Sequence, residues 1–306
     1  MKFKSSRLEC WGRGPAAGSP AQISRQHSLW QQDIHDFGPW TPVSVDHRTM
    51  VTDNIWRSSK SGGDEKVVIW GPCDSVLDVG WNLSRNGQLA VWDSVIAVSQ
   101  ASGRGQRQRS WTSPPGNLYA AWRWPGTESL SSSGWTGLLS LLAGYLIAES
   151  LIAKGLSVRI KWPNDLLVKD RKVGGILLEQ KHGQTLVGIG INIVSHPKAH
   201  VLREALGLPA TSLCNEGLMT TPVSLWTEMV ETGKTKFYQI VDSLAPQEWT
   251  AALNHRLAWL GKRVWVGSGN KSPYEATIKG LAKDGGLELQ AEGKSHTIYS
   301  GNISPI

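Results

Sequence analysis

Residues 159–165 read RIKWPND, residues 172–179 read KVGGILLE, and residues 188–192 read GIGIN. Each run joins apolar, strand-forming residues to a polar cluster of different chemical character. Lys161 and Asp165 flank a corner whose backbone is restricted by Pro163. The glycines of the other two runs allow backbone to approach a ligand or another segment closely. The three runs therefore predict strands that carry a binding site.

A cationic loop lies upstream at residues 100–111, with the sequence QASGRGQRQRSW. Its arginines and glycines are Arg104, Arg107, Arg109, Gly103 and Gly105. The planar guanidinium of arginine suits phosphate and carboxylate oxygens, and the glycines allow the loop to open and close as a lid. Together with Lys161 and Lys172, this loop predicts a site for an anionic, phosphate-bearing ligand.

The composition is that of a globular chain. Its 306 residues, 40% of them hydrophobic, predict one large domain and one or two small ones. The three cysteines have no metal-ligand spacing, which argues against a disulfide framework or a zinc site and favours a reducing compartment. The most apolar stretch, residues 138–152, is too short to span a bilayer, and the N-terminus does not resemble a signal peptide. We therefore expect a cytoplasmic protein with no membrane segment.

The formal net charge of +7 raises the question of nucleic-acid binding. The positive charge is scattered, apart from the cluster at residues 104–109, and the chain has no zinc-finger spacing or RNA-binding signature. A basic loop over a phosphate-bearing ligand accounts for that cluster. We therefore expect no specific nucleic-acid partner.

The chain divides into three parts by composition. Residues 1–66 are rich in Gly, Ser, Pro, Gln and Trp without a sustained period, which predicts an N-terminal extension that is partly irregular or disordered, with a disordered tail over 1–28 and irregular chain over 33–45. Residues 67–254 form the main domain, with helices predicted at 75–85, 136–154 and 222–254 and further strands at 67–70, 94–99 and 118–122. Residues 255–306 alternate short strands with turns, which predicts a small barrel.

From residue 67 to its end the chain resembles the biotin protein ligases. The motifs that carry the resemblance are GRGxxxRxW at 103–111, SPxGNLY at 113–119, KWPND at 161–165, KVGGILxE at 172–179, GxGIN at 188–192, ATSL at 210–213 and GNIS at 301–304. The resemblance implies an α+β fold. Its catalytic domain would be like that of class II aminoacyl-tRNA synthetases, with a mixed sheet flanked by helices, followed by a C-terminal SH3-like β-barrel.

The resemblance also implies an ATP-dependent, AMP-forming ligase. Biotin's carboxylate attacks the α-phosphate of MgATP to give biotinyl-5'-AMP and pyrophosphate. A lysine of a biotin carboxyl carrier protein then attacks the mixed anhydride and releases AMP. ATP, Mg²⁺ and biotin are thus the implied small molecules, and the carrier is the implied protein partner.

Four residues are implied to be catalytic: Lys161, Asp165, Arg104 and Lys172. Lys161 would contact the acyl-phosphate region, Lys172 would meet biotin's carboxylate, and Asp165 would help place Mg²⁺ or accept the carrier lysine's proton. The residues implied to contact biotin or nucleotide are Ser75, Gln100, Gly103, Arg104, Gly105, Arg107, Arg109, Trp111, Asn164, Gly175, Ile176, Leu177, Gly188 and Asn192. A purely structural alternative also holds for some of them, since Asp165 can cap a turn and the glycines can form a bulge in a core strand.

Two stretches depart from the family pattern. Ser75-Val76-Leu77 stands where the family usually has Ser-Thr-Asn, so Val76 lacks a hydroxyl whose hydrogen bond is worth about 0.5–1.5 kcal/mol. Gln106 and Gln108 replace an arginine and a glycine of the loop. Two alternatives therefore stay open, a ligase for another acyl acid such as lipoate and a non-catalytic sensor of biotin or its adenylate. Residues 1–66 show no helix-turn-helix spacing, so no winged-helix domain is expected, and a homodimer stays open.

Overall fold

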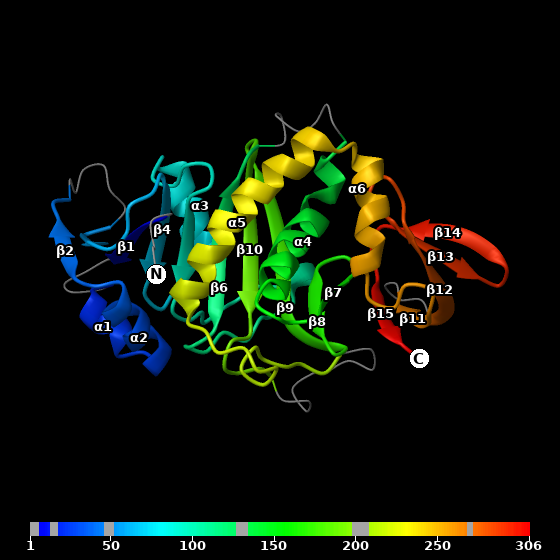
Figure 1. Cartoon of the computed structure of the whole chain (residues 1–306), viewed down its shortest axis with the longest axis horizontal. Helices are drawn as coiled ribbons and strands as arrows, with labels where there is room; N and C mark the ends of the chain where they lie inside the picture. The colour runs from blue at the N-terminus through cyan, green and yellow to red at the C-terminus, as the bar shows by residue number, and fades with distance from the viewer. Residues whose placement is uncertain (1–5, 13–17, 46–51, 127–133, 198–207, 268–271) are drawn as a thin grey trace.

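The structure, a computed structural model, describes residues 6–12, 18–45, 52–126, 134–197, 208–267 and 272–306. A ten-stranded sheet runs through the main body, and a separate five-stranded sheet lies at the C-terminal end (Figure 1). In spatial order the large sheet contains β2 (Trp40–Val43), β3 (Asn54–Ser58), β1 (Ser6–Gly12), β4 (Glu65–Trp70), β5 (Ser94–Ala97), β6 (Leu118–Trp124), β10 (Gln184–Ile191), β9 (Arg171–Lys181), β8 (Asp165–Val168) and β7 (Val158–Lys161). The β1–β4 and β4–β5 pairs are parallel and the other neighbours are antiparallel, so the sheet is mixed.

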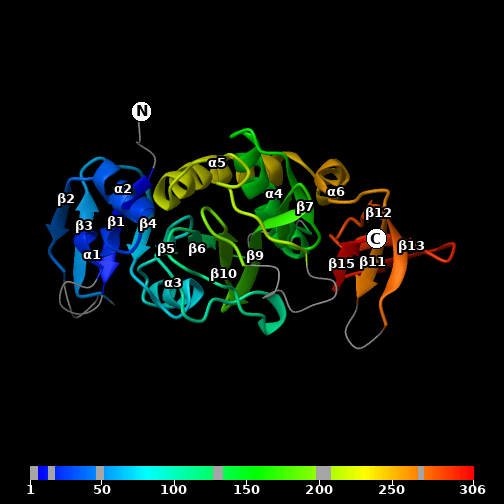
Figure 2. The ribbon, with the colours of Figure 1, turned by 90° about the horizontal axis from the view of Figure 1, so that it is seen from below.

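Helices cover both faces of this sheet (Figure 2). They are α1 (Pro20–Ser24), α2 (Ser28–Asp36), α3 (Val76–Arg85), α4 (Leu139–Ile152), α5 (Pro222–Ser243) and α6 (Pro246–Leu253), with short 3₁₀ turns η1 (Gln106–Gln108), η4 (Thr136–Leu138) and η6 (Asn254–Arg256). α3 packs on one face against β5, β6 and β10, whereas α4 and α5 pack together on the other. The hydrophobic core is accordingly split into two clusters, one on each side of the sheet. The predicted α+β class with a mixed sheet is confirmed.

The helices follow from local sequence. α3 begins after Ser75, which has an extended backbone, and ends at Asn86, followed by Gly87 with a positive φ of 68°. α4 is apolar over most of its surface because it packs against both the sheet and α5, and its Glu149 pairs with Arg256 at 2.8 Å. The single helix predicted over 222–254 is interrupted, because Ala245 precedes Pro246 and takes an extended conformation.

The disordered tail predicted over 1–28 and the irregular chain predicted over 33–45 are wrong for residues 6–12 and for most of residues 18–45, whereas residues 1–5 and 13–17 lie outside the described residues. β1 lies inside the sheet between β3 and β4, and α1, α2, β2 and β3 also fall within residues 6–58. Glu9, which breaks the apolar pattern of β1, is buried and pairs with Arg57 of β3 at 2.8 Å. Asp33 of α2 is also buried and accepts hydrogen bonds from Thr221 Oγ1 at 2.5 Å and from the backbone N–H of Val223 at 2.9 Å, at the start of α5. Partners that lie far along the chain therefore order this segment, and short local patterns do not show them.

The C-terminal sheet has the order β14-β13-β12-β11-β15, with all neighbours antiparallel. Its strands are β11 (Arg263–Gly267), β12 (Tyr274–Leu281), β13 (Leu287–Ala291), β14 (Lys294–Ile298) and β15 (Asn302–Pro305). The indole N–H of Trp162, in the turn after β7, donates to the carbonyl of Gly285 at 2.9 Å. This contact fastens the small sheet beside the β7–β8 corner of the large one.

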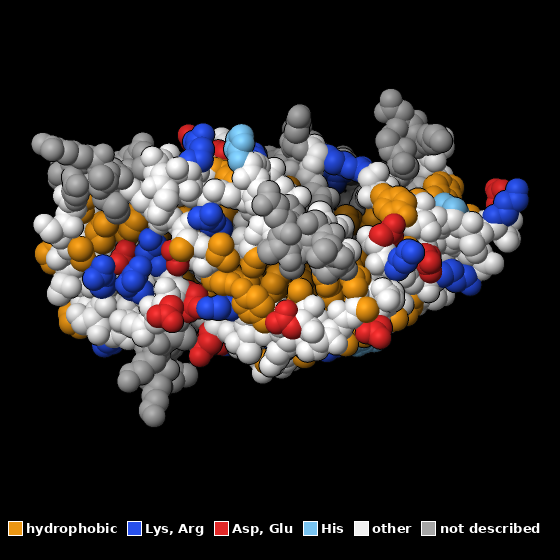
Figure 3. Space-filling view, turned by 90° about the horizontal axis from the view of Figure 1, so that it is seen from above, with side chains coloured by type: hydrophobic (Ala, Val, Ile, Leu, Met, Phe, Trp, Pro, Cys, Tyr) orange, Lys and Arg blue, Asp and Glu red, His pale blue; other side chains and the backbone are white. Residues whose placement is uncertain are grey.

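On the face shown in Figure 3, the described residues form no single basic band. Lys and Arg side chains lie scattered there among Asp and Glu. Among the helices that the structure describes, none is both long and apolar enough to cross a membrane.

Candidate active site

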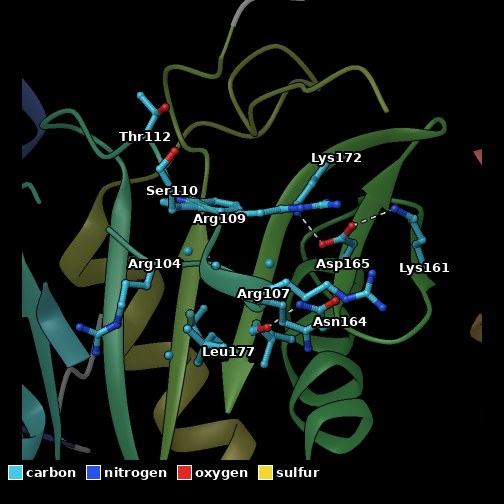
Figure 4. Close-up of a pocket in the computed structure, with 18 of the residues that line it drawn as sticks. Arg104, Arg107, Arg109, Ser110, Thr112, Lys161, Asn164, Asp165, Lys172 and Leu177 are labelled. Atoms are coloured by element: carbon cyan, nitrogen blue, oxygen red, sulfur yellow. Dashed lines mark hydrogen bonds and ion pairs between the residues drawn. The ribbon is translucent and has the colours of Figure 1, made fainter. Parts of the chain in front are cut away.

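A pocket of about 310 Å³ lies between the loop 100–113, the strands β7 to β10 and the start of β15 (Figure 4). This volume falls within the range of small-molecule sites. Its lining includes nearly all the residues predicted from sequence: Ser75, Gln100, Arg104, Gly105, Arg107, Arg109, Trp111, Lys161, Asn164, Asp165, Lys172, Gly175, Ile176, Leu177, Gly188 and Asn192. Gly103 does not line this pocket and instead packs at the base of the loop, where a Cβ would meet the Trp111 carbonyl at 2.5 Å.

At one end of the pocket two lysines share one carboxylate. Lys161 Nζ lies 3.2 Å from Asp165 Oδ2, and Lys172 Nζ lies 2.5 Å from Asp165 Oδ1. The β7–β8 hairpin brings Lys161 opposite Asp165, and an irregularity in the β8–β9 pairing at Leu166/Leu167 accompanies the approach of Lys172. Figure 4 shows the two ammonium groups on different sides of the carboxylate. The cluster carries a net positive charge and can attract an anion.

Burial affects Lys161 and Asp165 of this cluster differently. Burial lowers the pKa of Lys161, and the neighbouring Asp165 opposes that shift only in part. Burial alone would raise the pKa of Asp165, but Lys172 and Lys161 outweigh it and hold that pKa below its ordinary value. Asp165 is therefore ionised at neutral pH.

The fit of Asp165 to a magnesium ion is poor. Both of its oxygens already face ammonium groups, which would repel a dication placed beside them. No group of three or more His, Cys, Asp or Glu among the described residues could hold a metal ion. The predicted role of Asp165 as a Mg²⁺ ligand is not supported by its surroundings, and no chemical step is assigned to a metal at this carboxylate.

The glycines of the site make room for Trp111 and Leu77. A Cβ on Gly190 would lie 2.7–2.9 Å from the Trp111 indole, one on Gly175 would lie 3.1 Å from it, and one on Gly188 would lie 2.9 Å from Leu77. Lys172 Nζ is 5.1 Å from the centre of a Trp111 ring, which is cation–π distance. The loop is thus closed onto β9 and β10 through Trp111. The Gly-x-Gly spacing allowed this close approach to be predicted, but not which side chains would make it.

The far end of the pocket is mostly apolar, with Ser75 as its isolated hydroxyl. Ser75 is 2% exposed, and its Oγ is buried without a hydrogen-bond partner among the described residues. Leu77 and Leu177 lie nearby in the lining. The Gln100 amide is engaged at both ends, since Oε1 accepts from the Val76 N–H and Nε2 donates to Ser113 Oγ, each at 2.8 Å. Gln100 therefore braces the loop against α3, and Ser75 is the polar atom left for a ligand at this end.

The arginines of the loop differ in direction. Arg109 extends toward the Lys172–Asp165 pair, whereas Arg104 points away from it (Figure 4). Arg104 instead pairs with Asp78 of α3 at 2.7 Å and with Glu179 of β9 at 3.3 Å. Arg107, with φ of 56°, forms the turn at the tip of the loop.

Two asparagines expected to contact biotin or nucleotide also form hydrogen bonds to backbone carbonyls of neighbouring segments. Asn164 Nδ2 donates to the carbonyl of Ile176 at 2.7 Å, and Asn192 Nδ2 donates to the carbonyl of Thr211 at 3.0 Å. Asn302 is among the lining residues that were not assigned a role from sequence. Asn302 of β15 accepts a hydrogen bond from Lys161 Nζ at 2.9 Å. Its motif, GNIS at 301–304, is visible in the sequence, but its partner is not.

Comparison with known proteins gives a consistent result. Residues 76–194 match the biotin/lipoate A/B protein ligase family. The chain is 44% identical over 244 residues to the bifunctional ligase/repressor BirA of Escherichia coli (strain K12), covering 72% of this chain and 69% of that protein. It is 32% identical over 192 residues to a biotin–[acetyl-CoA-carboxylase] ligase of Paracoccus denitrificans, covering 56% of this chain and 71% of that protein.

Solved structures show a related fold. The biotin protein ligase from Aquifex aeolicus in complex with biotin and ATP superposes with a TM-score of 0.64 at 22% identity, covering 78% of this chain and 97% of that one. At this identity the likeness speaks to the fold.

Proposed function

Because the chain belongs to the biotin protein ligase family, we propose that it is an ATP-dependent biotin protein ligase. It would form biotinyl-5'-AMP with release of pyrophosphate and then pass biotin to a lysine of a biotin carboxyl carrier protein. The observation that carries this proposal is that the two ends of the pocket differ in chemical character. Its two ends are a lysine-rich anion site and an apolar slot that ends at the unpartnered hydroxyl of Ser75.

The lysine cluster suits the first half-reaction. A carboxylate and a triphosphate repel each other, and charges that are already in place offset that repulsion without reorganising. Lys161 and Lys172 supply two ammonium groups held on one carboxylate, and Arg109 reaches toward them from the loop. Lys172 would meet biotin's carboxylate, and Lys161 would contact the phosphate that is attacked.

The second half-reaction needs protection from water and a neutral lysine on the carrier. The loop 100–113, closed over the pocket through Trp111, would exclude water from the mixed anhydride. Asp165 is a weak base, since both of its oxygens face ammonium groups and its pKa is lowered. We infer that its main role is to orient the two lysines.

The slot would take the bicyclic head of biotin. Ser75 Oγ would hydrogen-bond the ureido group, with Gly175, Ile176, Leu177 and Gly188 forming the walls. Val76 and Leu77 add no hydroxyl or amide here, so fewer hydrogen bonds would distinguish biotin from a less polar acid. Lipoate therefore remains the second candidate substrate, favoured by this apolar lining.

The sheet topology bears on the division of the chain into domains. The five-stranded C-terminal sheet, in which β15 returns to pair with β11, supports an SH3-like barrel over residues 255–306. A boundary at residue 66 would fall inside β4, so we propose that β1 to β3 belong to the same unit as residues 67–254. We also propose that the protein works in the cytoplasm, where carrier proteins and ATP are present.

Pyrophosphate exchange tests the function directly. Purified protein is assayed with ATP and with biotin, lipoate or octanoate in parallel. We expect exchange that depends on biotin, followed by transfer to a carrier domain. Exchange with lipoate alone would make the protein a ligase for that acid, and biotin binding without any exchange would make it a sensor.

A further inference from the structure

Asn302 joins the C-terminal sheet to the lysine cluster. Its Oδ1 accepts a hydrogen bond from Lys161 Nζ at 2.9 Å, which is shorter than the 3.2 Å contact between the same ammonium group and Asp165. Lys161 is 6% exposed, so this ammonium group has little water to replace a lost partner. Of its three N–H donors, the described residues take up two, which leaves one for a ligand.

The position of Asn302 is set by packing of the whole sheet. Asn302 begins β15 and pairs with Gly267 of β11. The sheet is held beside the β7–β8 corner by the Trp162–Gly285 hydrogen bond. The backbone N–H of Ala258 also donates to the carbonyl of Ile160, one residue before Lys161, at 2.9 Å. Asn302 is therefore held at the pocket by the backbone of the C-terminal sheet, whose position beside the β7–β8 corner is set by these hydrogen bonds.

The chemistry of a carboxamide matters at this position. Lys161, Lys172 and Asp165 together carry one net positive charge, because one carboxylate faces two ammonium groups. A neutral acceptor can orient an ammonium group and leave its charge available to an anion. A second carboxylate would instead cancel the net charge of the cluster.

We propose that Asn302 is a positioning residue of the adenylation site, where its neutral carboxamide aims the Lys161 ammonium at the reacting phosphate while preserving its charge. The inference rests on the proposed function, since it assigns the C-terminal sheet a part in the first half-reaction. It also explains why residues 301 and 302 line the pocket at all.

Two substitutions separate this role from a merely structural one. Asn302→Ala removes the acceptor, so the Lys161 ammonium becomes harder to keep charged and the alkaline limb of the exchange rate moves to lower pH. We expect kcat to fall by roughly tenfold or more, the effect of a lost hydrogen bond to a charged group. Asn302→Asp stabilises the ammonium and moves the limb to higher pH, but it weakens anion binding and raises KM for ATP. The control is Tyr299→Phe, at an exposed residue between β14 and β15. It should leave kcat, KM for ATP and the pH of the alkaline limb unchanged.

A substrate-free measurement makes the test independent of the function. In protein labelled at lysine Cε, the resonance assigned with Lys161→Arg reports the pKa of Lys161 by NMR titration. The same opposite shifts are expected, down in Asn302→Ala and up in Asn302→Asp. Thermal unfolding of each variant shows that it is folded, and Asn302→Leu, which also lacks an acceptor but keeps a similar side-chain volume, replaces Asn302→Ala if the latter is not.

The outcomes separate the two proposals. If wild-type protein shows no exchange but the titration shifts as expected, the ligase function fails and the Asn302–Lys161 coupling stands. If wild-type protein is active and neither variant moves the pH limb or the titration, the positioning role is overturned.

Discussion

Arg104 donates hydrogen bonds from Nη1 to both carboxylate oxygens of Asp78, at 2.8 and 2.7 Å. Its Nη2 also donates to Glu179 at 3.3 Å. Arg104 thus ties the loop 100–113 to α3 and β9, on opposite sides of the slot that Leu77 and Leu177 line. Because these carboxylates already neutralise its charge, Arg104 anchors the loop to α3 and β9. Arg109 and the two lysines, in contrast, face the anion site.

Asp78→Asn should loosen the loop. Asp78 and Arg104 have side chains that are 57% and 35% exposed, so the pair is worth at most about 1 kcal/mol. We expect biotinyl-adenylate to dissociate roughly two- to fivefold faster, which stopped-flow displacement measures. Asp74→Asn, an exposed carboxylate just before the same helix, is the matched control. Equal release rates for wild type and Asp78→Asn would show that the Asp78–Arg104 pair does not hold the loop closed.

Lys161→Ala should abolish adenylation without unfolding the protein. The substitution removes a charge aimed at the developing negative charge, which typically costs about 10²–10³ in rate. Pyrophosphate exchange measures the loss, and circular dichroism checks the fold. Lys169→Ala serves as control because its side chain is 77% exposed and does not line the pocket. Exchange close to the wild-type rate would remove Lys161 from the mechanism.

The exchange rate should fall on the alkaline side at a pH below 10.5, the ordinary pKa of lysine. Burial lowers the pKa of Lys161, so its ammonium loses the proton, and with it the charge needed for catalysis, at a lower pH than an exposed lysine would. A rate profile against pH measures this limb. Lys161→Arg keeps its charge throughout and should move the limb to higher pH, whatever its absolute rate. A limb at the same pH in both proteins would assign the titration to another group.

Gly190→Ala should disturb the closed loop. The added Cβ would lie 2.7–2.9 Å from the Trp111 indole, so the ring has to move away from β10. We expect the Kd for biotinyl-adenylate to rise about tenfold, measured by titration calorimetry, since overpacking of this kind costs about 1–3 kcal/mol. Gly71→Ala is the control, because a Cβ added there would have no neighbouring atom within 4 Å. Unchanged affinity would show that the indole relocates without cost.

Asp33→Ala should destabilise the whole protein. It leaves the Val223 N–H and the Thr221 hydroxyl without their buried acceptor, at a cost of about 1–3 kcal/mol for each group left unpaired. Chemical denaturation should show a lower midpoint in a single transition. Asp36→Ala, three residues later on the same helix with a side chain 48% exposed, should change it little. Separate unfolding of the N-terminal residues, with the main transition unmoved, would contradict a shared fold.

Much of the site could be predicted because its motifs are local. Lys161 and Asp165 are four residues apart on a hairpin, so their pairing follows from the short corner between them. The glycines of β9 and β10 lie where the Trp111 and Leu77 side chains approach the strand backbone closely, and glycine at such positions is visible in the sequence. The same locality explains the success with α3 and α4, whose apolar spacing and end signals lie within one segment.

Other features could not be predicted, because their partners lie far along the chain. β1 contains Arg7 and Glu9, which break its apolar pattern, and its place in the sheet depends on pairing with β3 and β4. The Arg104 guanidinium was expected to face the anion site. It pairs with Asp78 and Glu179 instead, and these partners could not be predicted because they approach Arg104 only when the loop folds onto α3 and β9. The roles of Val76 and Gln106 in ligand choice stay predictions.

By itself, the sequence determined the family, the α+β class and most of the residues that line the pocket, since each motif gives the identity and spacing of its side chains. Only the tertiary structure decided that residues 6–58 complete the large sheet, that Arg104 fastens the loop and that Asn302 reaches Lys161. Arg104 and Asp78 lie 26 residues apart in the sequence, and Asn302 and Lys161 lie 141 residues apart. Such contacts depend on the packing of whole sheets and helices, which no local period or spacing encodes.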